Sequence, residues 1–263
     1  HHCGYSVPAA TVCSSCASGR LTSVGFGTER LEEELRRLLP AARISRLDRD
    51  TAVSRGDFYR VLQEVREGAV DVLIGTQMIT KGHHFPGVTL VGVVWADAGL
   101  GLPDYKAGER TFQLLSQVMG RAGRGERPGR VIIQAMRPEH YSVDCARRHD
   151  YAGFVGREME LRREFAFPPF SRLAGILFEG DSEELTREAA MAAKGVLARH
   201  GRGLLVLGPA PAPLYRLRDR YRWQCLLKSA SSELLHRACR EVRQGHGSSR
   251  VKLAVDIDPE NLL

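Results

Sequence analysis

Two short segments of this sequence combine residue types that bind phosphate. In the later one, Gln117-Val-Met-Gly120-Arg121-Ala-Gly123-Arg124, two arginines stand three residues apart at the end of an amphipathic run. Side chains at this spacing are neighbours on a helix, and each guanidinium fork can bind a phosphate through two hydrogen bonds. The glycines between them let the backbone approach a ligand closely. The alternative is a basic surface turn, because Gly-Arg pairs are common in basic proteins.

The earlier segment follows a short apolar run, residues 72–74, which is expected to be a buried strand. Thr76 and Gln77 come directly after it, and such side chains can hydrogen-bond a sugar–phosphate backbone without reading its sequence. Lys81 adds a positive charge, and Gly82 lets the turn bend. Lys81 could instead be a solvated surface side chain. If both segments lie on one α/β sheet, they form a more specific signal of a nucleic-acid motor than either segment does alone.

The elements that must position these segments alternate between strand and helix over residues 21–150. This alternation predicts a parallel sheet covered by helices on both faces, with ligands bound beyond the carboxyl ends of the strands. Thr28 is the expected N-cap of the first helix, which Pro40 ends. The strand at 88–95 is almost entirely apolar and is therefore expected to be buried on both faces. The predicted strands are 21–26, 42–47, 71–76, 88–95 and 130–134, and the later helices are 57–68 and 109–119.

A separate small domain is predicted for residues 168–263, because Pro168-Pro169 marks a boundary and a new order of elements follows it. Residues 135–167 are polar and expected to be helical, and 151–167 are assigned to a helical connection. The order βαββαβ after the boundary predicts a ferredoxin-like α+β domain of four antiparallel strands under two helices. Its predicted strands are 171–179, 204–207, 221–228 and 251–256, and its helices 182–200 and 232–244.

Arginines and aromatic residues alternate between Arg216 and Trp223. Such a strip can hold phosphates and stack bases. The alternative is a solvated strand face of a hairpin whose aromatic residues, Tyr221 and Trp223, point inward. Both interpretations remain open from the sequence.

The first twenty residues contain Cys3, Cys13 and Cys16 and have no helical period. Cysteines two residues apart can hold one tetrahedral zinc ion, so residues 1–20 are predicted to be a partial zinc-binding segment whose other ligands lie upstream. A surface tail with free thiols is the alternative. The remaining cysteines are irregularly spaced and fit a reducing, cytoplasmic setting better than a secreted disulfide scaffold.

Composition narrows the class of protein. The chain has 263 residues, a net charge of +7 and a pI near 9.3. This balance favours polyanionic partners such as DNA or RNA, although an arginine-rich proteome would produce it too. No apolar run approaches the roughly 18 residues that span a bilayer, and no secretory leader is expected. Because the first residue is His1 rather than Met, the natural amino terminus is expected further upstream.

The chain resembles the carboxy-terminal part of the primosomal protein N′ family, the bacterial replication-restart DNA helicases of superfamily 2. GTQMITKGHHFPGVTLVGVV resembles motif V of that family, ERTFQLLSQVMGRAGRG its motif VI and GFGTERLEEEL its motif IV region. CGYSVPAATVCSSC resembles the last cysteine pairs of its zinc-binding insertion, and FAFPPFSRLA and VDIDPENLL resemble its carboxy-terminal domain. His84 stands where superfamily-2 helicases often have Asp, but histidine also occurs within the restart helicases.

The resemblance implies the second RecA-like lobe of an ATP-dependent 3′→5′ DNA helicase, assigned to residues 21–150. Arg121 and Arg124 would contact the γ-phosphate of ATP, with Gln117 positioning them. The family's nucleotide is held with Mg²⁺ mainly by a first lobe, and the P-loop pattern G-x-x-x-x-G-K-[ST] of that lobe is absent from this sequence. The chain by itself is therefore expected to hydrolyse almost nothing.

The resemblance also implies the remaining ligands and partners. Gly82, Gly120 and Gly123 would border the nucleotide. In the family eight cysteines bind two Zn²⁺ ions, with the cysteine pairs arranged crosswise, so any zinc site formed from this chain alone would be incomplete. Forked DNA, primosome proteins and single-stranded DNA-binding protein would be the partners, in the cytoplasm and away from membranes. Thr76, Gln77 and Lys81 would touch the DNA backbone.

Two other functions remain possible at this stage. The first is a non-catalytic module that binds forks and loads partners, with a decayed motor; the second is an RNA helicase of similar lobe architecture. The upstream sequence would distinguish the non-catalytic module from the helicase. An intact P-loop and acidic motif there would favour the enzyme, and their loss would favour the module.

Overall fold

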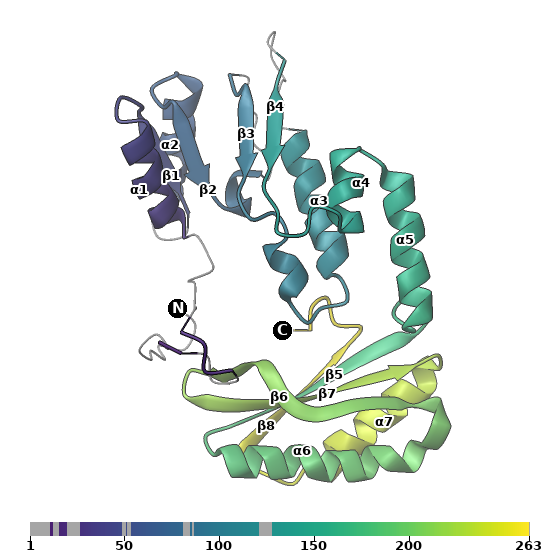
Figure 1. Ribbon diagram of the computed structural model, residues 1–263. Coiled ribbons are helices and arrows are strands. Elements are labelled where there is room, and N and C mark those ends of the chain that lie inside the picture. The colour runs from purple at the N-terminus through teal and green to yellow at the C-terminus, as the bar shows by residue number, and fades with distance from the viewer. Residues whose placement is uncertain are drawn as a thin grey trace. The chain divides into compact units, whose positions relative to one another are not determined.

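A computed structural model of the chain describes residues 11–12, 16–19, 27–48, 51, 54–80, 85, 87–120 and 128–262. These residues fall into two compact units (Figure 1). The parallel unit comprises the described residues of 8–99 and 110–150. The carboxy-terminal unit comprises those of 100–109 and 151–262.

The parallel unit contains two pairs of parallel strands. β1 pairs with β2, and β3 pairs with β4. The parallel direction confirms the prediction, but the described strands form two two-stranded sheets rather than one. The elements in this part of the chain are α1 (Thr28–Leu38), β1 (Ile44–Leu47), α2 (Arg55–Arg66), β2 (Val72–Gly75), a 3₁₀ turn (Gln77–Thr80), β3 (Leu90–Val93), a 3₁₀ turn (Ala98–Gly101), α3 (Ala107–Met119), β4 (Arg130–Ile133) and α4 (Tyr141–Arg147).

The expectation that the strand at 88–95 is buried on both faces is wrong. Burial alternates along β3 and along β4, and Leu90 and Ile132 are 57% and 55% exposed. Apolar composition indicates a strand, but it does not say which strand or helix covers it. The strand predicted at 21–26 lies outside the described residues.

The starts of the first two helices differ from prediction for reasons of hydrogen bonding. Thr28 is not the N-cap of α1: Gly27 occupies that position, and the Thr28 hydroxyl donates instead to the Asp48 carboxylate. Helix α2 begins two residues before the predicted start. Its cap is Ser54, whose hydroxyl accepts from the backbone N–H of Asp57 at 3.2 Å while the Asp57 carboxylate accepts from the backbone N–H of Ser54 at 3.1 Å. This reciprocal pair is a capping box, which satisfies two backbone donors at once.

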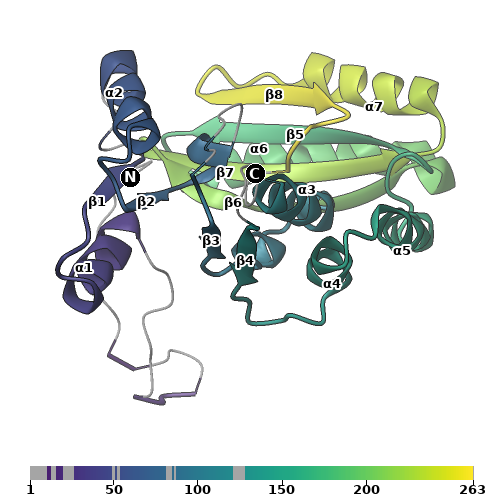
Figure 2. The same cartoon turned by 90° about the horizontal axis from the view of Figure 1, so that it is seen from above.

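The carboxy-terminal unit contains one antiparallel sheet, in the order β6-β7-β5-β8 (Figure 2). This is the predicted βαββαβ arrangement. The elements are α5 (Tyr151–Glu164), β5 (Arg172–Gly180), α6 (Glu183–Leu197), a 3₁₀ segment (Ala198–Gly203), β6 (Leu205–Leu217), β7 (Arg220–Ser229), α7 (Ser232–Gly245) and β8 (Val251–Ile257).

Helices α6 and α7 lie on one face of this sheet (Figure 1). Alternate residues of β5 and β7 point into the core that the helices cover, and the most buried side chains include Ile176, Phe178, Leu227 and Leu235, all at 0% exposure. Full burial of a large apolar side chain contributes roughly 1.5–3 kcal/mol, so this layer is the main source of stability in the unit.

Strand β6 extends ten residues beyond the predicted strand at 204–207, to Leu217. The prolines at 209, 211 and 213 argue against a central strand, because proline cannot donate to a ladder. The strand accommodates them because it lies at the sheet edge and its register with β7 shifts between Leu207 and Ala210 and between Pro211 and Arg216.

Among the helices that the structure describes, none is both long enough and apolar enough to cross a bilayer.

Candidate nucleic-acid interface

The carboxyl ends of β1 and β2 form an edge at which the first predicted site residues lie. The strands are in register, with Leu47 opposite Gly75, so the chain leaves both strands at the same level. Thr76 and Gln77 follow β2 directly, and both are exposed. The Thr76 carbonyl accepts from the N–H of Ile79 at 3.2 Å, which closes the turn. Two predicted DNA-contacting residues are thus accessible at the edge where parallel sheets bind ligands.

Gly75 is required for this edge to form. A Cβ atom at Gly75 would lie 2.7 Å from the carbonyl oxygen of Leu47 and 3.0 Å from Cγ2 of Ile79. Real Cβ contacts are essentially never closer than 3.0 Å to another heavy atom, so only glycine allows β2 to approach β1 while the turn folds back.

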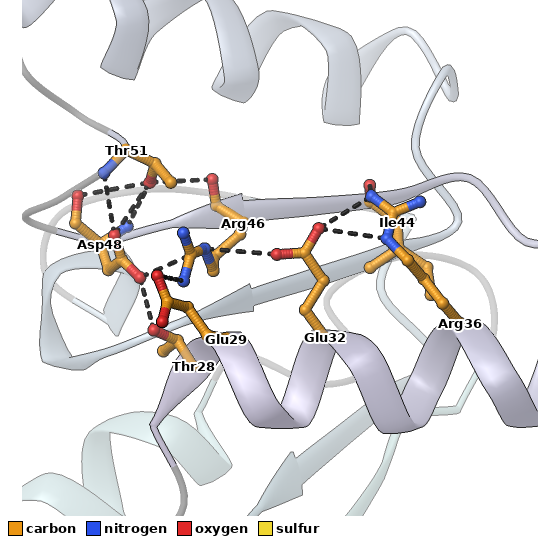
Figure 3. Close-up of polar contacts among 8 residues, drawn as sticks. All are labelled: Thr28, Glu29, Glu32, Arg36, Ile44, Arg46, Asp48 and Thr51. Atoms are coloured by element: carbon orange, nitrogen blue, oxygen red, sulfur yellow. Dashed lines mark hydrogen bonds and ion pairs between the residues drawn. The ribbon is translucent and has the colours of Figure 1, made fainter.

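A network of charges lies beside this edge, between α1 and the end of β1 (Figure 3). The Arg46 guanidinium faces three carboxylates: Glu29 at 3.3 Å, Glu32 at 3.3 Å and Asp48 at 3.5 Å. The Arg46 side chain is only 14% exposed. Burial disfavours its charge, but Glu29 and the other carboxylates outweigh this effect and raise the pKa of Arg46.

Asp48 joins this network to the loop after β1. Its carboxylate accepts from the Thr28 hydroxyl on α1 and from the backbone N–H of Thr51 at 3.0 Å, and its own N–H donates to the Thr51 hydroxyl at 2.9 Å. Arg36 also pairs with Glu32, at 2.8 Å, so three carboxylates face two guanidinium groups. One negative charge remains in excess, so the network holds α1 in place and does not itself attract phosphate. Sequence reasoning missed this network, because its members are separated by up to 20 positions.

A second connection missed by sequence reasoning joins the carboxyl ends of β3 and β4. The Asp97 carboxylate accepts from the backbone N–H groups of Met136 at 3.0 Å and Arg137 at 2.8 Å. Asp97 is 5% exposed. Its burial opposes ionisation, but the two backbone donors outweigh burial and lower the pKa of Asp97. The segment after β4 is therefore fixed to the loop after β3.

Helix α3 presents the second predicted segment. Phe112, Leu115 and Val118 are buried along one side, whereas Gln117 is exposed on another. The helix ends at Met119, and the N–H of exposed Gly120 donates to the Ser116 carbonyl at 3.3 Å.

Gln117 and Gly120 are therefore accessible at the carboxyl end of a helix, where cations are electrostatically favoured. In the sequence, arginines follow directly at 121 and 124. Arg121, Gly123 and Arg124 lie outside the described residues, as do Lys81 and Gly82. Thr76 and Gln77 thus follow β2, whereas Gln117 and Gly120 lie at the end of α3, between β3 and β4 in the chain. The residues that would complete both segments lie outside the described residues.

Of the three predicted zinc ligands the structure describes only Cys16, which is exposed and has a free thiol. Cys3 and Cys13 lie outside the described residues. Within the described ranges no three His, Cys, Asp or Glu side chains gather as metal ligands would. Cys225 and Cys239 are buried in the carboxy-terminal core, where burial raises the pKa of each thiol to about 11.

The strip of arginines and aromatics forms the β6–β7 hairpin. Trp223 packs against the core, as the hairpin interpretation requires. Arg222, however, is not solvated: it is 8% exposed, and its guanidinium donates to the Leu214 carbonyl at 3.4 Å. The Arg220 Nε lies 3.0 Å from the Glu179 carboxylate. Arg218 is exposed at the turn, whereas Arg222 is unavailable to a phosphate without rearrangement.

Comparison with known proteins finds similarity over nearly the whole chain. Residues 163–260 match the family model described as the primosomal protein N C-terminal domain. The chain is 43% identical, over 98% of its length, to the replication restart protein PriA of Bacillus subtilis (strain 168). It matches the carboxy-terminal part of PriA.

Other PriA proteins give the same result. The chain is 38% identical over its full length to PriA of Haemophilus influenzae, and 38% identical over its full length to PriA of Treponema pallidum. It covers 33% of the Bacillus protein, 36% of the Haemophilus protein and 40% of the Treponema protein. The chain therefore spans about a third of the length of these PriA relatives.

Proposed function

We propose that this chain is the second motor lobe and carboxy-terminal domain of an ATP-dependent 3′→5′ DNA helicase that recognises stalled replication forks and starts replication again. The observation that supports this most strongly is its similarity to PriA proteins over nearly its whole length. The exposed Thr76–Gln77 turn at the carboxyl edge of two parallel strands is where such a lobe would meet its ligand.

The parallel unit is proposed to be the RecA-like lobe. Two features support this assignment: the strands are parallel within each pair, and a helix connects the two strands of each pair, α2 between β1 and β2 and α3 between β3 and β4. The first predicted segment directly follows the end of β2 at Gly75, and the second spans the end of α3 at Met119.

The proposed role of Arg121 and Arg124 is to neutralise charge on the γ-phosphate of ATP held, with Mg²⁺, mainly by another lobe. The described residues next to them fit this role, because Gln117 and Gly120 are exposed and the end of α3 favours cations. Gly120, Gly123 and Gly82 would let backbone approach the nucleotide closely.

The proposed DNA contacts are Thr76, Gln77 and Lys81. The carboxylates around Arg46 lie at the neighbouring strand end and would repel phosphate, so a positive charge from Lys81 would be needed at this edge. Neutralising Lys81 is expected to reduce the salt dependence of DNA binding, since each phosphate contact releases counterions.

Zinc is proposed to bind Cys3, Cys13 and Cys16 together with cysteines elsewhere in a longer protein. Thiolate ligands suit Zn²⁺, and Cys16 is accessible to it. Chelation of zinc is expected to speed alkylation of Cys16, whereas buried Cys225 should react slowly with or without metal. Equal rates at Cys16 before and after chelation would contradict the zinc site.

The proposed partners are forked DNA, primosome proteins and single-stranded DNA-binding protein, and the proposed place of action is the cytoplasm. The names of the PriA relatives support a role in replication restart, while the particular protein partners rest on resemblance alone.

The test is unwinding by the longer protein that contains this chain. Forked DNA with a 3′ or a 5′ single-stranded tail would be incubated with ATP and Mg²⁺, and strand separation followed. The proposal predicts unwinding with 3′→5′ polarity. Tight fork binding without ATP-dependent unwinding would contradict it and favour the non-catalytic loading module.

A further inference from the structure

Arg162 on α5 joins three parts of the carboxy-terminal unit. Its Nη2 donates to the Glu109 carboxylate at 2.7 Å, its Nε to the Glu158 carboxylate at 2.7 Å and its Nη1 to the Pro168 carbonyl at 3.3 Å. The Arg162 side chain is 13% exposed. Each of its three donor nitrogens thus has an acceptor, which a buried guanidinium requires.

The charge balance around Arg162 favours these bonds. Burial disfavours the charged form, but Glu109 and Glu158 outweigh burial and raise the pKa of Arg162. Glu109 also lies in the first turn of α3, where a carboxylate interacts favourably with the helix dipole. Charge-assisted bonds of 2.7 Å are among the stronger contacts available to a side chain.

The segment just before α3 is held by further contacts of the same unit. Tyr105 stacks on Phe167 with ring centroids 5.1 Å apart and planes 8° from parallel. The Arg162 guanidinium lies 5.4 Å from the centre of the Tyr105 ring. The Asp104 carboxylate accepts from the backbone N–H of Leu262 at 3.3 Å. Residues 104–109 are therefore fixed at three points.

Helix α3 connects this fixed end to the predicted nucleotide segment. It runs without a break from Ala107 to Met119, starting in the carboxy-terminal unit and ending in the parallel unit. Glu109 lies near one end and Gly120 follows the other, about 16 Å away at 1.5 Å per residue. Because a continuous helix is stiff over this length, the position of its first turn constrains the position of Gln117 and Gly120.

We propose that Arg162 is a positioning residue that holds α3 through Glu109 and so sets where Gln117 and Gly120 lie. This inference rests on the proposed function for the role of α3 in hydrolysis. The carboxy-terminal domain thereby acts on the rate of ATP hydrolysis without touching the nucleotide.

The anchor itself is tested on this chain by amide hydrogen exchange. Glu109→Ala is compared with Glu160→Ala. The control removes an exposed ion pair, Arg157–Glu160 at 3.0 Å, from α5, the helix that also carries Arg162. Losing a charge-assisted bond is expected to raise exchange in the first half of α3 about tenfold, and losing the surface pair less than twofold.

A double-mutant cycle separates the contact with Arg162 from the effect of Glu109 on the helix dipole. Arg162→Met should raise exchange as Glu109→Ala does, and Glu109→Ala should add little in the Arg162→Met background. Fully additive effects would overturn the anchor. Glu109→Gln, which retains an acceptor, should restore part of the protection.

The positioning role is tested in the longer protein by DNA-stimulated ATP hydrolysis, with Arg124→Ala as the reference variant. Glu109→Ala should lower kcat about tenfold or more while changing KM for ATP less than twofold, and Glu160→Ala should change neither. The unfolding temperature of each variant is measured in parallel. A variant that loses activity only because it is less stable would show a lower unfolding temperature.

The outcomes separate this inference from the proposed function. If Arg124→Ala abolishes hydrolysis but Glu109→Ala behaves like Glu160→Ala, the positioning role of Arg162 is wrong and the proposed function stands. If the parent protein shows no DNA-stimulated hydrolysis, the proposed function is wrong. If only Arg124→Ala leaves hydrolysis unchanged, the role proposed for Arg124 is wrong. In both cases the exchange cycle still decides whether Arg162 anchors α3.

Discussion

At the residue scale, Gly75 is the position where β2 approaches β1 too closely for a side chain. Gly75→Ala would place a methyl group 2.7 Å from the Leu47 carbonyl oxygen, a backbone atom that cannot rotate away. We expect a loss of about 1–3 kcal/mol in the free energy of unfolding, measured by urea denaturation.

The matched control for this substitution is Gly92→Ala. Gly92 is also a strand glycine, but a Cβ atom there would have no heavy atom within 4 Å. Its stability should therefore stay within about 0.5 kcal/mol of the parent chain. Equal stability of the Gly75 and Gly92 variants would contradict the close approach of the two strands.

Asp71 gives a prediction about pH. Its carboxylate accepts from the Arg43 backbone N–H at 2.8 Å and from the Arg43 Nε and Nη2 at 2.9 and 2.7 Å. These bonds from Arg43 hold the pKa of Asp71 well below its usual range. Because the folded-state pKa is depressed, the stabilisation is full above the unfolded value of about 3.9 and is lost as pH falls below it.

The corresponding measurement is the unfolding free energy of the parent chain and of Asp71→Asn as a function of pH. The difference should be largest at neutral pH and shrink as pH falls below about 4. Asp181→Asn, at an exposed position, is the control substitution. A difference between parent and Asp71→Asn that does not vary with pH would show that the Asp71 charge is not involved.

At the element scale, the start of α7 depends on one hydroxyl. The Ser231 side chain accepts from the backbone N–H of Leu234 at 3.2 Å, which caps the helix. Ser231→Ala should lower the free energy of unfolding by about 1 kcal/mol. Ser232→Ala, one position later and inside the helix, should have little effect. Thermal unfolding of both variants compares them directly, and equal losses would mean that the cap contributes nothing.

The sequence predicts most elements because their signals are local. The antiparallel domain follows the expected βαββαβ order, and its first strand, β5, begins at Arg172. Strand β6 is underestimated because its prolines argue against a strand, and only its position at the sheet edge makes them tolerable. Sheet membership in the parallel unit is not predictable from apolar composition, which does not identify hydrogen-bonding partners.

For the candidate site, the sequence locates the motif residues but not the ion pairs beside them. Thr76, Gln77, Gln117 and Gly120 are exposed at the ends of elements where the motifs place them. The ion pairs of Arg46 are missed, because they depend on residues far apart in the chain that a helical or strand period does not reveal.

At the scale of the whole molecule, the two units differ in which comparisons with known proteins cover them. The family model matches residues 163–260, within the carboxy-terminal unit, whereas the predicted nucleotide and DNA residues belong to the parallel unit. The PriA relatives match both units together. Helix α3 has residues in each unit, and the role proposed for Arg162 acts through this helix.

The central claim is that this chain supplies arginines to a nucleotide held by another lobe. The most direct measurement is DNA-stimulated ATP hydrolysis by the longer protein with Arg124→Ala, compared with Arg157→Ala on the exposed surface of α5. Removal of an arginine that stabilises the transferring phosphoryl group is expected to lower kcat by about 10³-fold or more, with the Arg157 variant unchanged. Unchanged hydrolysis in Arg124→Ala would contradict the account.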